Sequence, residues 1–280
     1  MKSRNLIYLS SVFYLFAAHI SATGEKIDNS VQAQSMLAVL YAQSSAEYEA
    51  NNLQTFAGAK LALEKALVNK NWTAAIEQKE DFSEKPPAVI LDIDETVLNN
   101  IPFQARAIIK GEGYPSGWID WMLEEASTSV SGAKDFLEYA EKKGVKIFYV
   151  TNRVAIVEEA TRNNLKKLGL PLDTDRDVLL MKNENGWTSD KVSRRQLISK
   201  DYRVLLLIGD QLGDFISLEE STINMDSRKA ISTKYKDMWG KKWFMITNPI
   251  YGRWEASLYN NEYPENEDEL IKMRMKALKP

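Results

Sequence analysis

Between residues 88 and 247, hydrophobic residues gather in short unbroken runs separated by longer polar or helical stretches. Such runs are typical of parallel strands covered on both faces of a sheet, because every side chain is then buried. We therefore expect buried strands at 88–91 (AVIL), 145–150 (VKIFYV), 177–181 (DVLLM), 203–208 (RVLLLI) and 243–247 (WFMIT).

Stretches of helical composition separate several of these runs. Residues 133–143 and 154–168 have this composition, and Gly169 and Pro171 follow the second stretch, as is common after a helix. Alternating strands and helices predict an α/β fold with a doubly wound parallel sheet, whose ligands bind at the carboxyl ends of the strands.

Further helical segments lie before and inside this core. Apolar residues recur at three- and four-residue spacings over 30–71, which predicts two amphipathic helices. The stretch 99–130 is too long for an ordinary connection and predicts a smaller helical cap over the sheet edge. We expect an N-terminal helical segment at 30–85 contributing to the cap, a catalytic core at 86–260 and a helical tail at 261–280.

The first residues have the composition of a secretory signal peptide. Lys2 and Arg4 precede an apolar stretch at 6–18, and we expect cleavage after Ala22, so that the signal spans 1–22. The alternative, an uncleaved membrane anchor, needs about 20 apolar residues, more than this stretch offers. Because the chain has no cysteine for a lipid or a disulfide, we predict a periplasmic or secreted protein without stable membrane insertion.

Composition limits the chemistry available to the mature chain. The only histidine, His19, lies within the predicted signal peptide, and cysteine is absent. Hydrolases that depend on imidazole or thiolate, and conventional zinc sites, are thereby excluded. A formal net charge of -3 without a long basic block argues against a nucleic-acid polymer as partner. Carboxylates, lysine, threonine and a metal that prefers oxygen ligands remain.

Polar residues stand at or near the ends of the predicted strands, which meet at one edge of a parallel sheet. Each has a structural explanation as well: residues after a strand often cap a helix, and a lysine at a helix start is usually solvated. Their order along the chain, DxDxT, Thr, Lys and GDxxxD, favours a common site over chance. The residues are Asp92, Asp94, Thr151, Asn152, Lys191, Asp210 and Asp214.

This ordered set resembles the motifs of the haloacid dehalogenase superfamily of phosphotransferases. The stretches AVILDIDETVLNN at 88–100, VTNR at 150–153 and GKKWFMITNPIYGRWEASL at 240–258 look like the class C acid phosphatases, bacterial enzymes related to lipoprotein 5'-nucleotidases. The chain departs from the lipoprotein members because it lacks the lipid-bearing cysteine. Plant storage proteins with decayed motifs also resemble this group, but the motif residues are intact here.

The resemblance implies a phosphatase that forms an aspartyl-phosphate. Asp92 would be the nucleophile, and Asp94 would act as general acid and then as general base. Thr151, Asn152 and Lys191 would bind the phosphoryl oxygens. Because Asp94 has to be protonated when the reaction begins, we expect an acidic pH optimum.

The resemblance also implies Mg²⁺, because a carboxylate can approach a phosphate dianion only where positive charge offsets the repulsion. The implied ligands are the Asp92 carboxylate, the Asp94 main-chain carbonyl and Asp210. Asp214 would bind through water or orient the other ligands.

Arginines and aromatic residues are harder to assign. Arg153 could clamp phosphate or lie on a helix surface, and we place Arg195 on the surface. Trp and Tyr are frequent in the cap and the C-terminal segment, which core packing could explain. Because aromatic residues stack on the nucleobase in the related nucleotidases, we expect Trp118 and Tyr251 to bind substrate.

The predicted substrate is a small phosphomonoester, and a nucleoside 5'-monophosphate is the first to test. Three alternatives stay open: broad phosphatase specificity, phosphotransfer to an alcohol, and a non-catalytic storage or binding role on the same fold. The resemblance further suggests a homodimer.

Overall fold

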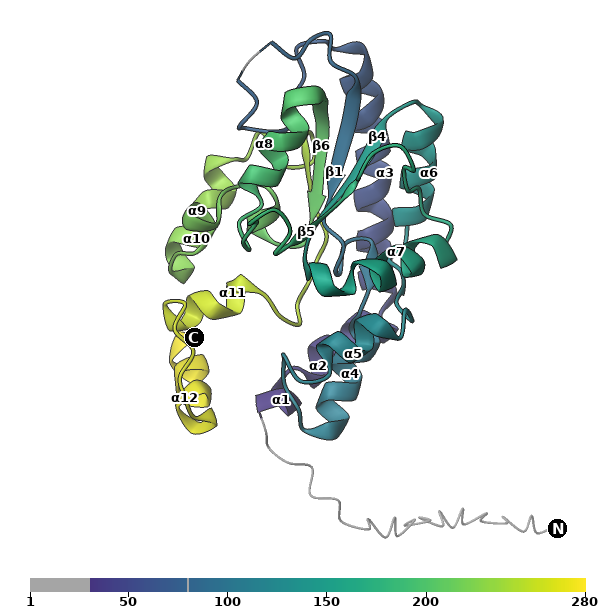
Figure 1. Ribbon diagram of the computed structural model, residues 1–280. Helices are drawn as coiled ribbons and strands as arrows, with labels where there is room; N and C mark the ends of the chain where they lie inside the picture. Colours follow the sequence, from purple (N-terminus) through teal and green to yellow (C-terminus); the bar gives the residue numbers. More distant parts are fainter. Residues whose placement is uncertain (1–30, 80) are drawn as a thin grey trace, which may run out of the picture.

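In the computed structural model, which describes residues 31–79 and 81–280, five parallel strands form the central sheet (Figure 1). The predicted signal peptide at 1–22 lies outside the described residues. The strand order is β5-β4-β1-β6-β7, so the strand that precedes the DxDxT motif is central. The strands are β1 Pro87–Leu91, β4 Lys146–Val154, β5 Leu179–Lys182, β6 Arg203–Gly209 and β7 Trp243–Met245.

Alternate residues of the strands pack into two separate hydrophobic cores, one on each face of the sheet. Val89 and Leu91 of β1 belong to one core, whereas Ala88 and Ile90 belong to the other. Because side chains alternate along a strand, a strand covered on both faces is apolar at every position. The doubly wound α/β fold predicted from the unbroken runs is therefore confirmed.

Helices α3 (Ala46–Val68) and α6 (Ala133–Lys142) cover one face of the sheet, and α8 (Val192–Asp201) and α10 (Met225–Lys234) lie over the other (Figure 1). None of the described helices is long and apolar enough to cross a membrane. The other elements outside the cap region are η1 Ala155–Val157, α7 Glu158–Lys167, η2 Leu212–Asp214, α9 Leu218–Ser221, α11 Arg253–Ala256, η3 Ser257–Tyr259 and α12 Glu267–Ala277.

Helix α3 can lie close to the sheet because its buried stripe contains small side chains. Ala59, Ala62 and Ala66 are buried on this stripe, whereas Leu61, which fits the helical spacing, is 69% exposed. At the end of the helix, buried Arg203 donates to the carbonyl oxygen of Ala66 at 3.1 Å, which complements the helix C-terminus. Within the segment 30–85 that we expected to contribute to the cap, α3 therefore belongs to the core layers.

A smaller helical unit lies at one end of the sheet (Figure 1). Its residues include the stretch 99–130, whose role as a cap stays a prediction, and two N-terminal helices contact its first helix. Its elements are β2 Leu98–Asn99, α4 Ile101–Lys110, α5 Trp118–Leu123 and β3 Thr128–Ser129, and the N-terminal helices are α1 Val31–Gln34 and α2 Met36–Ser44.

Candidate active site

The carboxyl ends of β1 and β6 carry the aspartates singled out in the sequence. Asp92 directly follows β1, Asp210 directly follows β6, and Asp214 ends the short helix η2. Lys191 is the N-cap residue of α8, and α8 covers the face of the sheet opposite to α3. The fold thereby brings these four residues to one edge of the sheet.

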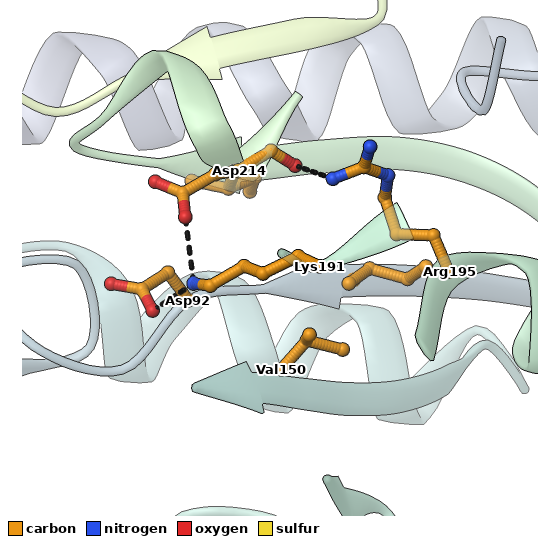
Figure 2. A pocket seen from close by; sticks show the side chains of 7 residues that line it. Asp92, Val150, Lys191, Arg195 and Asp214 are labelled. Carbon is orange, nitrogen blue, oxygen red and sulfur yellow. Dashed lines mark hydrogen bonds and ion pairs between the residues drawn. The ribbon is translucent and has the colours of Figure 1, made fainter. Parts of the chain in front are cut away.

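Lys191 joins two of these aspartates, as Figure 2 shows. Its Nζ lies 2.6 Å from Oδ1 of Asp214 and also forms an ion pair with Oδ1 of Asp92. Lys191 is 5% exposed and Asp92 is 8% exposed, so solvent screens their charges little. The ammonium group therefore holds the Asp92 carboxylate in place and provides positive charge beside it.

Asp92, Asp210 and Asp214 form a cluster in which one carboxylate oxygen from each lies within 4.8 Å of the others. Two side-chain amides orient Asp210: Nδ2 of Asn248 donates to its Oδ2 at 2.7 Å, and Nε2 of Gln211 donates to the same oxygen at 3.0 Å. Oxygen ligands held by hydrogen bonds are the donor set that Mg²⁺ prefers. The residues of this cluster therefore fit a divalent cation.

Burial dominates the electrostatics of the cluster, because apolar side chains of β1, β4 and β6 line the space beside it. Desolvation raises the pKa of Asp92 to about 7 and outweighs the opposing charge of Lys191. Desolvation and the neighbouring aspartates also raise the pKa of Asp210 well above its usual range. Burial acts to lower the pKa of Lys191, but its aspartate partners raise it further, so the ammonium stays charged.

The carboxylate of Asp94 is not part of this cluster and has its own hydrogen-bond partners. Its Oδ1 accepts hydrogen bonds from Nε of Arg153 and Nδ2 of Asn100, both at 2.9 Å. The sequence left Arg153 open between a phosphate clamp and a surface residue. Its side chain is 1% exposed and donates a hydrogen bond to Asp94. Two aspartates two positions apart thus have separate partners, which suits them to separate roles. The main-chain carbonyl of Asp94 stays a predicted metal ligand.

Thr151 and Asn152, predicted to bind phosphate, both lie within β4, and only Thr151 is buried. Oγ1 of Thr151 accepts the main-chain N–H of Arg153 at 3.0 Å. The side chain of Asn152 donates to the carbonyl oxygen of Ser189 at 3.1 Å and accepts from Arg194 at 2.9 Å. The bonds of Asn152 join β4 to the segment before α8 and to α8 itself, and phosphate binding by Thr151 and Asn152 stays a prediction.

The prediction that Arg195 lies on the surface is wrong. Its side chain is fully buried, pairs with Glu77 and donates to the carbonyl oxygens of Gly213 and Asp214 at 3.2 and 3.1 Å (Figure 2). A buried guanidinium needs several acceptors, and this one finds them on the backbone. Arg195 therefore fixes the main chain that carries Asp214.

Both aromatic residues predicted to bind substrate lie near residues of the site. The guanidinium carbon of Arg153 is 5.9 Å from the centre of the Trp118 ring. The hydroxyl of Tyr251 donates to the buried Glu95, and its main-chain oxygen accepts from Nε2 of Gln211 at 3.3 Å. Both aromatic residues are half-buried, so part of each stays accessible.

Sequence reasoning missed two polar residues that orient the site, Asn248 and Asn100. Asn248 comes soon after β7, so the rule that found the aspartates after other strands could have found it. Asn100 closes the DIDETVLNN stretch, and no spacing or strand end marks it. Its importance depends on contacts with α5 and β4, which lie far from it in the sequence.

Comparisons with known proteins agree with this geometry. The class C acid phosphatase from Bacillus anthracis is 33% identical to the chain, with a TM-score of 0.76 over 89% of this chain and 98% of that one. Its structure with tungstate bound gives 32% identity and a TM-score of 0.77 over the same shares.

A more distant relative comes from plants. Vegetative storage protein 1 of Arabidopsis thaliana is 27% identical over 135 residues, which are 45% of this chain. The match spans 48% of that protein, so the chain covers about half the length of this curated relative.

A family model provides the assignment. The model of the HAD superfamily, subfamily IIIB (acid phosphatase), matches residues 16–254, which is most of the sequence. This match and the similarity to the Bacillus structure confirm the resemblance seen in the motifs. The chain belongs to the acid phosphatases of the haloacid dehalogenase superfamily, subfamily IIIB.

Proposed function

We propose that this protein is a Mg²⁺-dependent acid phosphatase that hydrolyses small phosphomonoesters through an aspartyl-phosphate on Asp92. The observation that carries this proposal is the buried Lys191 ammonium, bonded to Asp92 beside two further carboxylates. Tungstate is a tetrahedral oxyanion like phosphate, and the similar Bacillus structure that binds it adds support. The predicted signal peptide at 1–22 supports a periplasmic or secreted location.

Asp92 and Asp210 would hold the metal together with the main-chain carbonyl of Asp94, and Asp214 would bind directly or through water. When bound, Mg²⁺ supplies charge that lowers the repulsion between the carboxylates and a phosphate dianion. The raised pKa values of Asp92 and Asp210 support this assignment, because desolvated carboxylates lack a sufficient counter-charge in the protein alone.

In the proposed reaction, the Asp92 carboxylate attacks phosphorus while the bond from phosphorus to the leaving oxygen breaks. Asp94 donates its proton to that oxygen, which departs as an alcohol. Water then attacks the phosphorus of the aspartyl-phosphate, Asp94 takes a proton from this water, and phosphate is released as Asp92 is regenerated. Thr151 and Lys191 would bind the transferring oxygens. The need for a protonated Asp94 at the start favours an acidic pH optimum.

A nucleoside 5'-monophosphate is the proposed substrate, because Trp118 and Tyr251 could stack on a base while the phosphate lies at Asp92. We expect phosphate release from 5'-AMP and from an aryl phosphate, at acidic pH and only with Mg²⁺. The measurement is release by the mature protein with Mg²⁺ and with a chelator. A higher kcat/KM for 5'-AMP indicates a nucleotidase, and equal values indicate a general phosphatase.

A storage role is the second candidate, because the plant relative is a storage protein by name. It predicts no phosphate release from either substrate with Mg²⁺ present. Release that survives chelation would instead contradict the metal requirement.

Mg²⁺ should stabilise the protein more at pH 7 than at pH 5. The folded pKa of Asp92 is about 7, whereas an unfolded aspartate titrates near 4, so the metal-free protein loses stability as pH rises between these values. Protons compete with Mg²⁺ for the same carboxylates. Protonation of Asp92 alone should weaken Mg²⁺ binding on the order of 50-fold between pH 7 and pH 5. Thermal unfolding with and without Mg²⁺ at both pH values measures the difference.

The matched control for this experiment is the double variant Asp210→Asn, Asp214→Asn. It removes two of the clustered carboxylates and should abolish the Mg²⁺-dependent rise in Tm at both pH values. An equal rise in Tm at pH 5 and pH 7 in the unmodified protein would contradict the assignment of these clustered carboxylates as ligands.

A further inference from the structure

Asn100 is a fully buried amide between the cap region and the catalytic aspartates. It occupies the N-cap position of α4, where an asparagine side chain normally accepts a hydrogen bond from the first turn of the helix. Here the side chain makes no such cap bond. Because the side chain does not cap the helix, other partners have to hold it.

Three donors converge on one atom of this side chain. Oδ1 of Asn100 accepts from Nε1 of Trp121 at 2.8 Å, from Oγ of Ser127 at 2.8 Å and from Nη2 of Arg153 at 3.2 Å. Indole and guanidinium groups can only donate, so a flipped amide would place its NH₂ group against two donors. The network therefore fixes the orientation of the amide.

With Oδ1 fixed in this way, Nδ2 of Asn100 points to Asp94. It donates to Oδ1 of Asp94 at 2.9 Å, and Nε of Arg153 donates to the same oxygen at 2.9 Å. Among the described residues, Oδ2 of Asp94 has no hydrogen-bond partner, and the side chain is 19% exposed. The two oxygens of Asp94 are thus made different by their neighbours.

We propose that Asn100 is a positioning residue that holds Asp94 by Oδ1 and leaves Oδ2 as the oxygen that exchanges the proton with the leaving group and with water. This inference rests on the proposed function. It also connects the cap to the chemistry, because Trp121 of α5 and Asp94 share one amide. Displacement of α5 would release the amide and, with it, the orientation of the acid.

The test compares two phosphomonoesters that differ in their need for an acid. An aryl ester with an acidic phenol leaves without protonation, whereas an alkyl ester needs a proton from Asp94. In Asn100→Ala, kcat/KM for the alkyl ester should fall about 10- to 100-fold further than for the aryl ester, within the roughly 100- to 10 000-fold that positioned acid–base catalysis contributes. The KM for the aryl ester should stay close to that of the unmodified protein.

Asn164→Ala is the matched control. Asn164 is 2% exposed and, like Asn100, binds Ser127, through bonds of 3.2 and 2.9 Å to the main chain. The ratio of alkyl to aryl kcat/KM should not change in this variant. Asn100→Asp keeps the volume and Oδ1 but loses the Nδ2 donor, so it should lower the ratio too and provides the test if the alanine variant does not fold.

Equal losses on both esters in the Asn100 variants would overturn the inference, as would an equally lowered ratio in Asn164→Ala. Inactivity of the unmodified protein on both esters would instead remove the proposed function and this inference with it. If the unmodified protein is active and the Asn100 variants keep its ratio of alkyl to aryl kcat/KM, only this inference is removed and the proposed function stands.

Discussion

Asp92→Asn should reduce phosphatase turnover by at least about 10 000-fold, because the amide has nearly the shape of the carboxylate but cannot attack phosphorus. The buried site should keep its geometry, since Lys191 retains its bond to Asp214. Phosphate release from 5'-AMP and from an aryl ester measures the loss. Acid quenching during turnover should trap phosphate on the peptide that carries Asp92, and none should be trapped in the variant.

Stability separates this loss of chemistry from loss of fold. The pKa of Asp92 is raised by desolvation, so its ionised form costs stability at neutral pH, and Asp92→Asn should not lower Tm there. The matched control is Asp135→Asn on the exposed side of α6, which should keep full activity. Residual turnover of Asp92→Asn above about 1% of the control would contradict the nucleophile assignment.

The layers of the fold could be predicted because burial on both faces leaves a direct trace in the sequence. The run expected at 88–91 is β1 Pro87–Leu91, and the run at 203–208 is β6 Arg203–Gly209. The expectation at 145–150 missed that β4 continues to Val154. Polar Thr151 and Asn152 end the apolar run, but the backbone stays extended through them toward the site.

The candidate site could be predicted only in part, for a physical reason. Side chains that follow a strand are placed by the sheet, which is why Asp92 and Asp210 meet as expected. Arg195 and Asn100 are placed by partners distant in sequence, Glu77 in one case and Arg153 in the other. Polarity suggested a surface position for Arg195, whereas backbone acceptors and an ion pair make its burial favourable.

The buried cations near the site each bond to a different part of it. Lys191 is the one cation bonded directly to the carboxylate cluster among the described residues. Arg195 donates to the main-chain oxygen of Asp214, and Arg153 donates to the carboxylate of Asp94. Removal of Lys191 should therefore leave the cluster without its direct counter-charge and lower the stability of the site.

Lys191→Met should lower activity by at least about 1 000-fold and destabilise the fold by about 3–5 kcal/mol at neutral pH. Methionine fills similar space, but Asp92 and Asp214 then face each other without the ammonium in a poorly solvated site. Protonation of Asp92 relieves this repulsion, so the loss of stability should be larger at pH 7.5 than at pH 5. Denaturant unfolding at both pH values measures it, and Lys200→Met on the exposed side of α8 is the matched control.

A second substitution distinguishes charge repulsion from poor packing. In Lys191→Met, Asp214→Asn, one of the two carboxylates that were bonded to the ammonium becomes a neutral amide, so stability at pH 7.5 should rise toward that of the unmodified protein. Activity should stay low, because no ammonium remains to offset the charge of the phosphate. If the double variant is as unstable as Lys191→Met at both pH values, the loss arises from packing, and Lys191 is not the counter-charge of this cluster. Recovery of stability without activity would show that the Lys191 ammonium both balances the charge of the carboxylates and offsets the charge of the phosphate.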